Sequence, residues 1–166
     1  WNYCVQTLPK VSRTFALNIS VLRGALHRSI LTSYLFCRIV DTVEDAAKLD
    51  PKIKIKLLME FSRLIEDPGY RDKNLTAWVE ECKTVDGSAS DLELLHQTQR
   101  VFNVFDSLAT NHQDQIIPSV SKMAKGMAFF QSRFQFGEIT PLGNIQELEE
   151  YCYFVAGVVG EMLCNL

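Results

Sequence analysis

The sequence contains none of the short motifs that mark the common hydrolases, zinc proteins and nucleoside-triphosphate-binding proteins. Its three histidines are scattered, and no HExxH or Cys/His ligand spacing occurs. A GxSxG nucleophile elbow and a Walker A loop are also missing. The reactions that depend on these motifs therefore have no support in the sequence.

Blocks of positive charge and long apolar runs are missing as well. The formal net charge is -3, and no Lys/Arg cluster is present, which argues against a nucleic-acid partner. The apolar run at 151–160 is far shorter than the roughly 20 residues that a membrane-spanning helix needs. Association with a membrane surface would therefore depend on parts of the protein outside this chain.

The five cysteines do not form a pattern typical of disulfides or metal sites. Their number is odd and no CxxC pair occurs, so reduced, buried thiols are the simplest interpretation. This favours a cytoplasmic protein, or a membrane-associated one that faces the cytosol.

The sequence predicts an all-α fold. Strand-like alternation is nearly absent, and glycine and proline mark only a few breaks. Ser12, Asp50 with Pro51, and Asn144 with Glu147 are helix-start signals. Longer helices are expected at about 51–66, 91–109 and 114–136, the last with Pro118 at its start.

These helices predict a single domain over residues 1–166 with one core. The chain starts at Trp1 and stops within an apolar run. We therefore expect it to be the N-terminal part of a longer domain.

The stretch Ile30–Ala46 is the most informative part of the chain. It contains no glycine or proline and is apolar on nearly every side. At about 100° per residue, a phenol, a guanidinium and two carboxylates fall within an arc of about 60°. These residues are Tyr34, Arg38, Asp41 and Asp45. Because burying unpartnered charges is costly, the stripe should face a wet or ligand-filled cavity.

The carboxylates of this stripe suggest a cation. Asp41 and Asp45 are four residues apart, with Glu44 beside them, and such neighbours repel unless a cation lies between them. Mg²⁺ takes carboxylates, water and substrate phosphates as ligands. An acidic helix end in solvent is the simpler alternative, but acidic residues there oppose the helix dipole.

Other candidate sites are weaker when taken alone. Ser12 and Arg13 open a helix and could form an anion site, although serine is an ordinary cap. A stripe of methionines and phenylalanines usually belongs to the core, but it could also line an apolar ligand site. That stripe consists of Met123, Met127, Phe130 and Phe134.

Three segments together resemble the squalene/phytoene synthase family. They are Val11–Phe15 (VSRTF), Tyr34–Asp45 (YLFCRIVDTVED) and Tyr151–Gly160 (YCYFVAGVVG), and they span almost the whole chain. The DTVED form and the neighbourhood of Lys125–Met127 look more like squalene synthases than phytoene synthases.

The resemblance implies an isoprenoid-synthase-type helical bundle around a central cavity. Family members join two prenyl diphosphates head to head through a cyclopropyl diphosphate, and squalene-type members then use NADPH. The resemblance implies Mg²⁺, with Mn²⁺ as an alternative ion, held by Asp41, Glu44 and Asp45.

Further roles carry over by position. Ser12, Arg13 and Arg38 would contact diphosphate, and Tyr34 and Tyr151 would lie beside the reacting carbons, with Tyr151 as the proton-abstracting group. The prenyl-chain lining would include Phe15, Met123, Met127, Phe130, Val155 and Gly157.

One departure from the family pattern concerns its second aspartate-rich motif, which nothing after Tyr151 resembles. We therefore expect this chain to be inactive alone and to self-associate through exposed apolar surface. A phytoene or dehydrosqualene synthase, and a non-catalytic relative used in assembly of another complex, remain alternatives.

Overall fold

The computed structural model describes residues 1–133 and 141–166, and within these ranges its regular secondary structure is helical, without a strand. Phe134 and residues 135–140, where the sequence predicts a helix end and a break, lie outside the described residues. The helices are α1 (Asn2–Val11), α2 (Arg13–Ser20), α3 (Gly24–Asp45), α4 (Pro51–Glu66), α5 (Pro68–Glu81), α6 (Ala89–His96), α7 (Thr98–Phe105), α8 (Thr110–Gln131), α9 (Ile145–Cys152) and α10 (Val158–Asn165).

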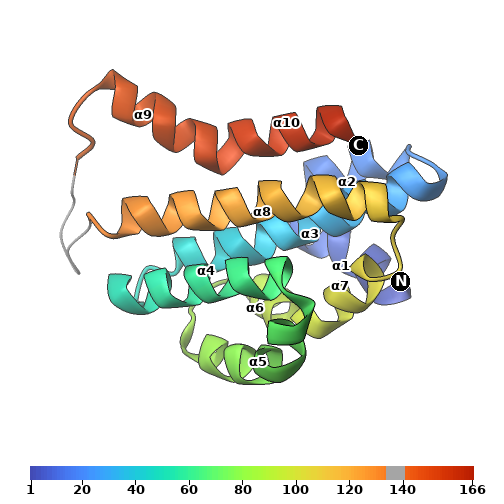
Figure 1. Cartoon of the computed structure of the whole chain (residues 1–166), viewed down its shortest axis with the longest axis horizontal. Helices are drawn as coiled ribbons and strands as arrows, with labels where there is room; N and C mark the ends of the chain where they lie inside the picture. Colours follow the sequence, from blue (N-terminus) through green and yellow to red (C-terminus); the bar gives the residue numbers. More distant parts are fainter. Residues whose placement is uncertain (134–140) are drawn as a thin grey trace.

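Helices α3 and α8 form the middle of the molecule. In Figure 1, α8 runs between the α9–α10 arm on one side and α4 on the other, with α3 alongside. A π-helical turn, Tyr153–Gly157, joins α9 to α10. The last segment of the chain therefore packs back along α8.

Local signals explain where several helices begin. The Ser12 hydroxyl accepts a hydrogen bond from the Phe15 amide (3.2 Å), and Asp50 accepts one from the Lys52 amide (2.7 Å) beside Pro51. Asn144 accepts one from the Glu147 amide (2.9 Å). These caps satisfy amides that have no partner within the helix, and the three predicted helix starts are confirmed.

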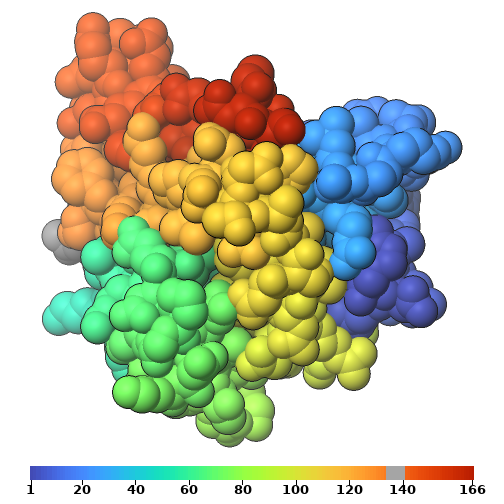
Figure 2. Space-filling model, turned by 45° about the vertical axis from the view of Figure 1, so that its right-hand side comes forward, coloured from blue at the N-terminus to red at the C-terminus, as the bar shows by residue number. Residues whose placement is uncertain are grey.

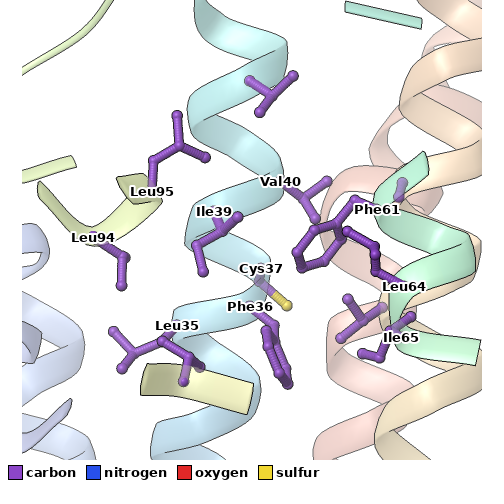
Figure 3. Close-up of a cluster of buried hydrophobic side chains, with 14 of the residues drawn as sticks. Leu35, Phe36, Cys37, Ile39, Val40, Phe61, Leu64, Ile65, Leu94 and Leu95 are labelled. Carbon is purple, nitrogen blue, oxygen red and sulfur yellow. The ribbon is translucent and has the colours of Figure 1, made fainter. Parts of the chain in front are cut away.

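Helix α3 is the core element that the sequence predicts, with small shifts at its ends. It begins at Gly24, whose φ of 62° lies in the left-handed region that glycine adopts readily, and it ends at Asp45. Its apolar side chains point toward both α4 and α6 (Figure 3). Leu35, Phe36 and Ile39 are fully buried.

Four local predictions are wrong. The sequence predicts no helix before Pro9, whereas α1 spans Asn2–Val11 with Pro9 inside it. The helix expected at 91–109 is split into α6 and α7 near Gln97. Pro118 lies inside α8, where it faces solvent and the carbonyl that loses its partner can reach water. The segment 67–70 (DPGY), whose residue types predict a turn, instead begins α5, with Asp67 as its cap.

The spacing of Lys52, Lys54 and Lys56 in α4 predicts an outward, solvated face, and this prediction is wrong for Lys54. Lys54 is 9 % exposed, and its Nζ donates to the backbone carbonyl of Glu44 (2.6 Å). On the same helix, Ile53 and Met59 are exposed although their spacing predicts them to be inward. The helix is therefore rotated relative to the expectation, because it packs against α8 and the end of α3.

The cysteines are free, and Cys4, Cys37 and Cys82 are buried, as expected, whereas Cys152 and Cys164 are exposed. Among the helices of the described ranges, none has the length and apolar character needed to cross a membrane.

An aromatic cluster fills the core between α3, α4 and α7. Phe36 lies 4.8 Å from Phe102 and 6.0 Å from Phe61 between ring centroids, and Trp78 stacks near Phe61. The Trp78 indole donates to the Leu57 carbonyl (2.9 Å), so its polar edge is satisfied.

We expect Phe36→Ala to lower the free energy of unfolding by about 3–5 kcal/mol, because it leaves a cavity among the rings. Phe129→Ala, at a side chain that is 53 % exposed, is the matched control and should cost less than about 1 kcal/mol. Urea unfolding measures both, and equal losses would contradict this account of the core.

Candidate active site

A cavity of about 700 Å³ lies between α2, α3, α8 and the last helical segment. Its wall is mainly apolar, and Figure 2 shows the segment that contains α2 next to the end of α10. The residues that line it are Phe15, Asn18, Ile19, Leu22, Ile30, Ser33, Tyr34, Cys37, Arg38, Asp41, Met123, Val155, Ala156, Val159, Gly160, Met162 and Leu163.

The polar stripe of α3 meets this cavity. Tyr34, Arg38 and Asp41 line it, while Asp45 lies one turn further along and is exposed. The Phe15 ring lies 5.3 Å from the Tyr34 ring. The helix thus presents a phenol, a guanidinium and a carboxylate to a mainly apolar cavity.

The surroundings of Asp41 disfavour the charged form of its carboxylate. Burial, followed by the neighbouring charge of Asp45, raises the pKa of Asp41 to about 7, and Arg38 only partly opposes this. No hydrogen bond or ion pair to Asp41 occurs within the described residues. A cation beside this carboxylate would therefore relieve both causes of the shift.

Arg38 is held in place by a residue that the sequence did not indicate. Its Nε and Nη2 donate to the two oxygens of Asp91 (2.9 and 3.0 Å), and the Ser88 hydroxyl donates to Asp91 Oδ2 (2.6 Å). Burial tends to raise the pKa of Asp91, but the bonds from Arg38 and Ser88 lower it overall. Arg38 therefore presents a fixed guanidinium to the cavity.

Sequence reasoning missed Asp91 because it is 53 residues from Arg38 and on another helix. The available signal was Ser88 followed by an acidic residue three positions on, which resembles a helix start. Ser88 does cap α6, since it accepts a hydrogen bond from the Asp91 amide (3.2 Å).

Tyr151 lies near the acidic end of α3. Its ring meets Phe130 edge-on at 5.2 Å. Burial raises the pKa of Tyr151 to about 12, and the charges of Glu44, Asp45 and Asp41 add to the shift. Burial also raises the pKa of Tyr34. Both phenols are therefore protonated at neutral pH.

Glu44 does not line the cavity. It is 8 % exposed, and its Oε1 accepts a hydrogen bond from Gln131 Nε2 (2.8 Å) on α8. Within the described residues no group of three His, Cys, Asp or Glu side chains is arranged to hold a metal ion. Asp41 and Asp45 still offer the one or two carboxylates through which Mg²⁺ commonly binds a phosphate complex.

The remaining candidates fall into two groups. Phe15, Met123 and Val155, which the resemblance assigns to the prenyl-chain lining, are among the residues that line this cavity. Met127 and Phe130 are buried in the core, while Ser12 caps α2, Arg13 is exposed and Gly157 is outside the lining. The sequence also gave no indication of the lining from Leu22, Val159 and Leu163.

Gly126 allows α8 and the last segment to approach closely. A Cβ at this position would clash with the Phe154 ring. The absence of a side chain therefore lets the π-helical turn seat against α8 and close the cavity.

We expect Asp41→Asn to stabilise the metal-free protein above pH 7 by an amount on the order of 4 kcal/mol. The folded-state pKa is raised to about 7 from the ordinary 3.8, so the folded protein retains this proton more readily than the unfolded chain. The stabilising effect of that proton is complete below about pH 4 and is lost as the pH rises to 7.

Thermal unfolding in a chelator should therefore show a gain for Asp41→Asn that grows between pH 4 and 7 and then stays constant. Asp72→Asn, at an exposed position of α5, is the control and should show no such trend. Parallel pH profiles for all three proteins would contradict the assignment of the shift to Asp41.

We expect Asp91→Ala to cost about 2 kcal/mol, because it leaves the Arg38 guanidinium without its bidentate partner. The control is Glu80→Ala, which removes an exposed ion pair with Lys83 and should cost less than about 0.5 kcal/mol. Urea unfolding measures the loss of unfolding free energy in both variants. Equal losses would show that the Arg38–Asp91 pair contributes no more to stability than the exposed pair.

Comparison with known proteins identifies the family. The sequence model described as squalene/phytoene synthase matches residues 8–166. Squalene synthase of Eremothecium gossypii is 32 % identical over 98 % of the chain, and squalene synthase 1 of Panax ginseng is 32 % identical over all of it. The chain spans about a third of the length of these relatives (34 % and 35 %).

Solved structures agree with this assignment. A structure described as TcSQS with the ligand BPH1237 matches 99 % of this chain, and 43 % of its own chain is covered, with a TM-score of 0.80 and 28 % identity. A second, with the ligand E5700, has a TM-score of 0.78. The predicted isoprenoid-synthase-type helical fold is confirmed, and the chain belongs to the squalene/phytoene synthase family.

Proposed function

We propose that the whole protein joins two farnesyl diphosphates head to head, through a cyclopropyl diphosphate, to squalene. One observation carries this proposal: α3 presents Tyr34, Arg38 and Asp41 to a mainly apolar cavity of about 700 Å³. Such a space suits a ligand with an anionic head and a long hydrocarbon tail. The similarity to squalene synthases favours the squalene-type reaction.

Arg38 is the residue that we assign to the diphosphate. Its Nε and Nη2 are engaged by Asp91, which fixes the plane of the guanidinium at the cavity wall. A pre-oriented guanidinium stabilises the negative charge that develops on a leaving diphosphate without reorganising. Arg13 and Ser12, at the exposed start of α2, would add to the anion site.

Asp41, Glu44 and Asp45 would hold Mg²⁺, or Mn²⁺ in its place. A bound divalent ion neutralises charge on the diphosphate and makes it a better leaving group. The raised pKa of Asp41, caused by burial and then by Asp45, supports a cation at this end of α3. In this role the carboxylates would bind the ion and orient the diphosphate, and Asp41 is the one that lines the cavity within the described residues.

The apolar wall would exclude water from the reacting carbons. Met123, Val155 and Val159 belong to the mainly apolar lining, and a dry wall protects an allylic cation from capture by water. Phe15 and Tyr34 face this space from α2 and α3, and Met127, Phe130 and Gly157 would support its wall. Tyr151 would take up the proton that the product cation loses; because burial raises its pKa and keeps the phenol protonated at neutral pH, it would have to pass its own proton to another base, such as the released diphosphate.

The same proposal implies a cofactor, a substrate and a cellular location. Reduction to squalene would use NADPH, and prenyl diphosphate is the substrate partner. The protein would be cytoplasmic, or membrane-associated and facing the cytosol through parts outside this chain. The exposed side chains of Phe15, Leu17 and Val21 favour self-association of the chain.

The test uses a protein of the relatives' full length, incubated with farnesyl diphosphate and Mg²⁺, with and without NADPH. We expect diphosphate release and squalene, and Asp41→Asn should reduce turnover by about 10²-fold or more. Asp72→Asn should be unaffected. Dehydrosqualene as the product, or phytoene from geranylgeranyl diphosphate, would favour the alternative synthases.

A second arm of the test compares the 166-residue chain with the longer protein. Asp41 is the one carboxylate lining the cavity within the described residues, so we expect diphosphate release only from the longer protein. Release by the chain alone would contradict this. Absence of release from both would favour the non-catalytic relative that acts in assembly of another complex.

A further inference from the structure

The end of α3 is held from behind by two other helices. On one side Lys54 of α4 donates from Nζ to the Glu44 backbone carbonyl (2.6 Å). On the other side Gln131 of α8 donates from Nε2 to Glu44 Oε1 (2.8 Å). Glu44, Lys54 and Gln131 are 8 %, 9 % and 4 % exposed, so these bonds are shielded from water.

A contribution to stability alone does not explain the hydrogen bond from Gln131 to the Glu44 carboxylate. Burying a carboxylate costs several kcal/mol unless it is fully paired, and a neutral amide gives only partial compensation. The Lys54 ammonium bonds to the backbone of Glu44 and not to its side chain. An apolar residue at 44 would avoid the cost altogether, which suggests that the orientation of this carboxylate serves another purpose.

The position of Glu44 indicates what that purpose is. Glu44 directly precedes Asp45 and lies three residues after Asp41, so all three carboxylates extend from the last turns of one rigid helix. Gln131 occupies Oε1 and leaves Oε2 without a hydrogen bond from another described helix. Partners that hold one oxygen of a ligand commonly fix the direction of the other.

We propose that Gln131 is a positioning residue for the divalent-cation site, acting through Glu44. It terminates α8, and its amide fixes the Glu44 carboxylate at the acidic end of α3 from 87 positions away in the sequence. The inference rests on the proposed function, because it requires a cation among Asp41, Glu44 and Asp45. It adds a determinant of cation affinity that lies outside the acidic motif.

The experiment is a Mn²⁺ titration of the folded protein followed by electron paramagnetic resonance, without substrate. Gln131→Leu should weaken Mn²⁺ binding by about tenfold or more. Gln99→Leu, which removes an exposed glutamine that bonds Asn103, is the matched control and should leave the affinity unchanged. Circular dichroism confirms that each variant is folded before titration.

A double-mutant cycle separates positioning from simple stabilisation. If Gln131 acts through Glu44, Gln131→Leu should have no further effect on Mn²⁺ affinity once Glu44→Gln is present. A merely structural glutamine would lower the unfolding free energy and leave the affinity of the folded protein unchanged. Independent, additive losses of affinity from the two changes would also overturn the inference.

The outcomes distinguish this inference from the proposed function. If the wild-type protein binds Mn²⁺ and Gln131→Leu binds it equally well, the positioning role fails while the cation site stands. If the wild-type protein binds no Mn²⁺, this result contradicts both the proposed cation site and the positioning role of Gln131.

Discussion

The structure depends on one constraint: α3 is the central buried helix, and it carries charged groups that must be compensated. Each compensating group comes from a different helix. Asp91 of α6 holds Arg38, Gln131 of α8 holds the Glu44 side chain, and Lys54 of α4 holds the Glu44 carbonyl. Packing against these helices therefore buries the apolar sides of α3 and satisfies its polar groups at the same time.

Asp41 is the exception to this compensation. It lies on the same stripe as Arg38 but forms no ion pair within the described residues. Its pKa rises because burial and Asp45 both disfavour its charge. A residue that destabilises the unliganded protein while facing a cavity is typical of a binding site, where a ligand supplies the missing partner.

The sequence was sufficient for features that depend on local physical chemistry. Helical spacing placed Tyr34, Arg38 and Asp41 on one stripe, and the structure brings them to one cavity. Side-chain caps identified the starts of α2 and α4. The family assignment followed from three segments whose order and spacing are specific, and it is confirmed by the match over residues 8–166.

Features that depend on long-range contacts could not be predicted in this way. Asp91 and Gln131 stand 53 and 87 positions from their partners, and neither has a local pattern that reveals the contact. Lys54 belongs to an apparently solvated lysine run, yet its stem is buried because α4 packs against the end of α3. Helical spacing gives a face, but only the packing of neighbouring helices decides what that face meets.

The last helical segment shows how local irregularity completes the site. A regular helix from Ile145 onward would present its apolar stripe along one straight line, whereas the π-helical turn at Tyr153–Gly157 inserts an extra residue into that line. Gly126 provides the space into which Phe154 fits at this turn. Tyr151 can therefore face Phe130 and the carboxylates of α3 while Val155 and Val159 face the cavity. The bend thus joins the acidic and apolar halves of the site within a single helix.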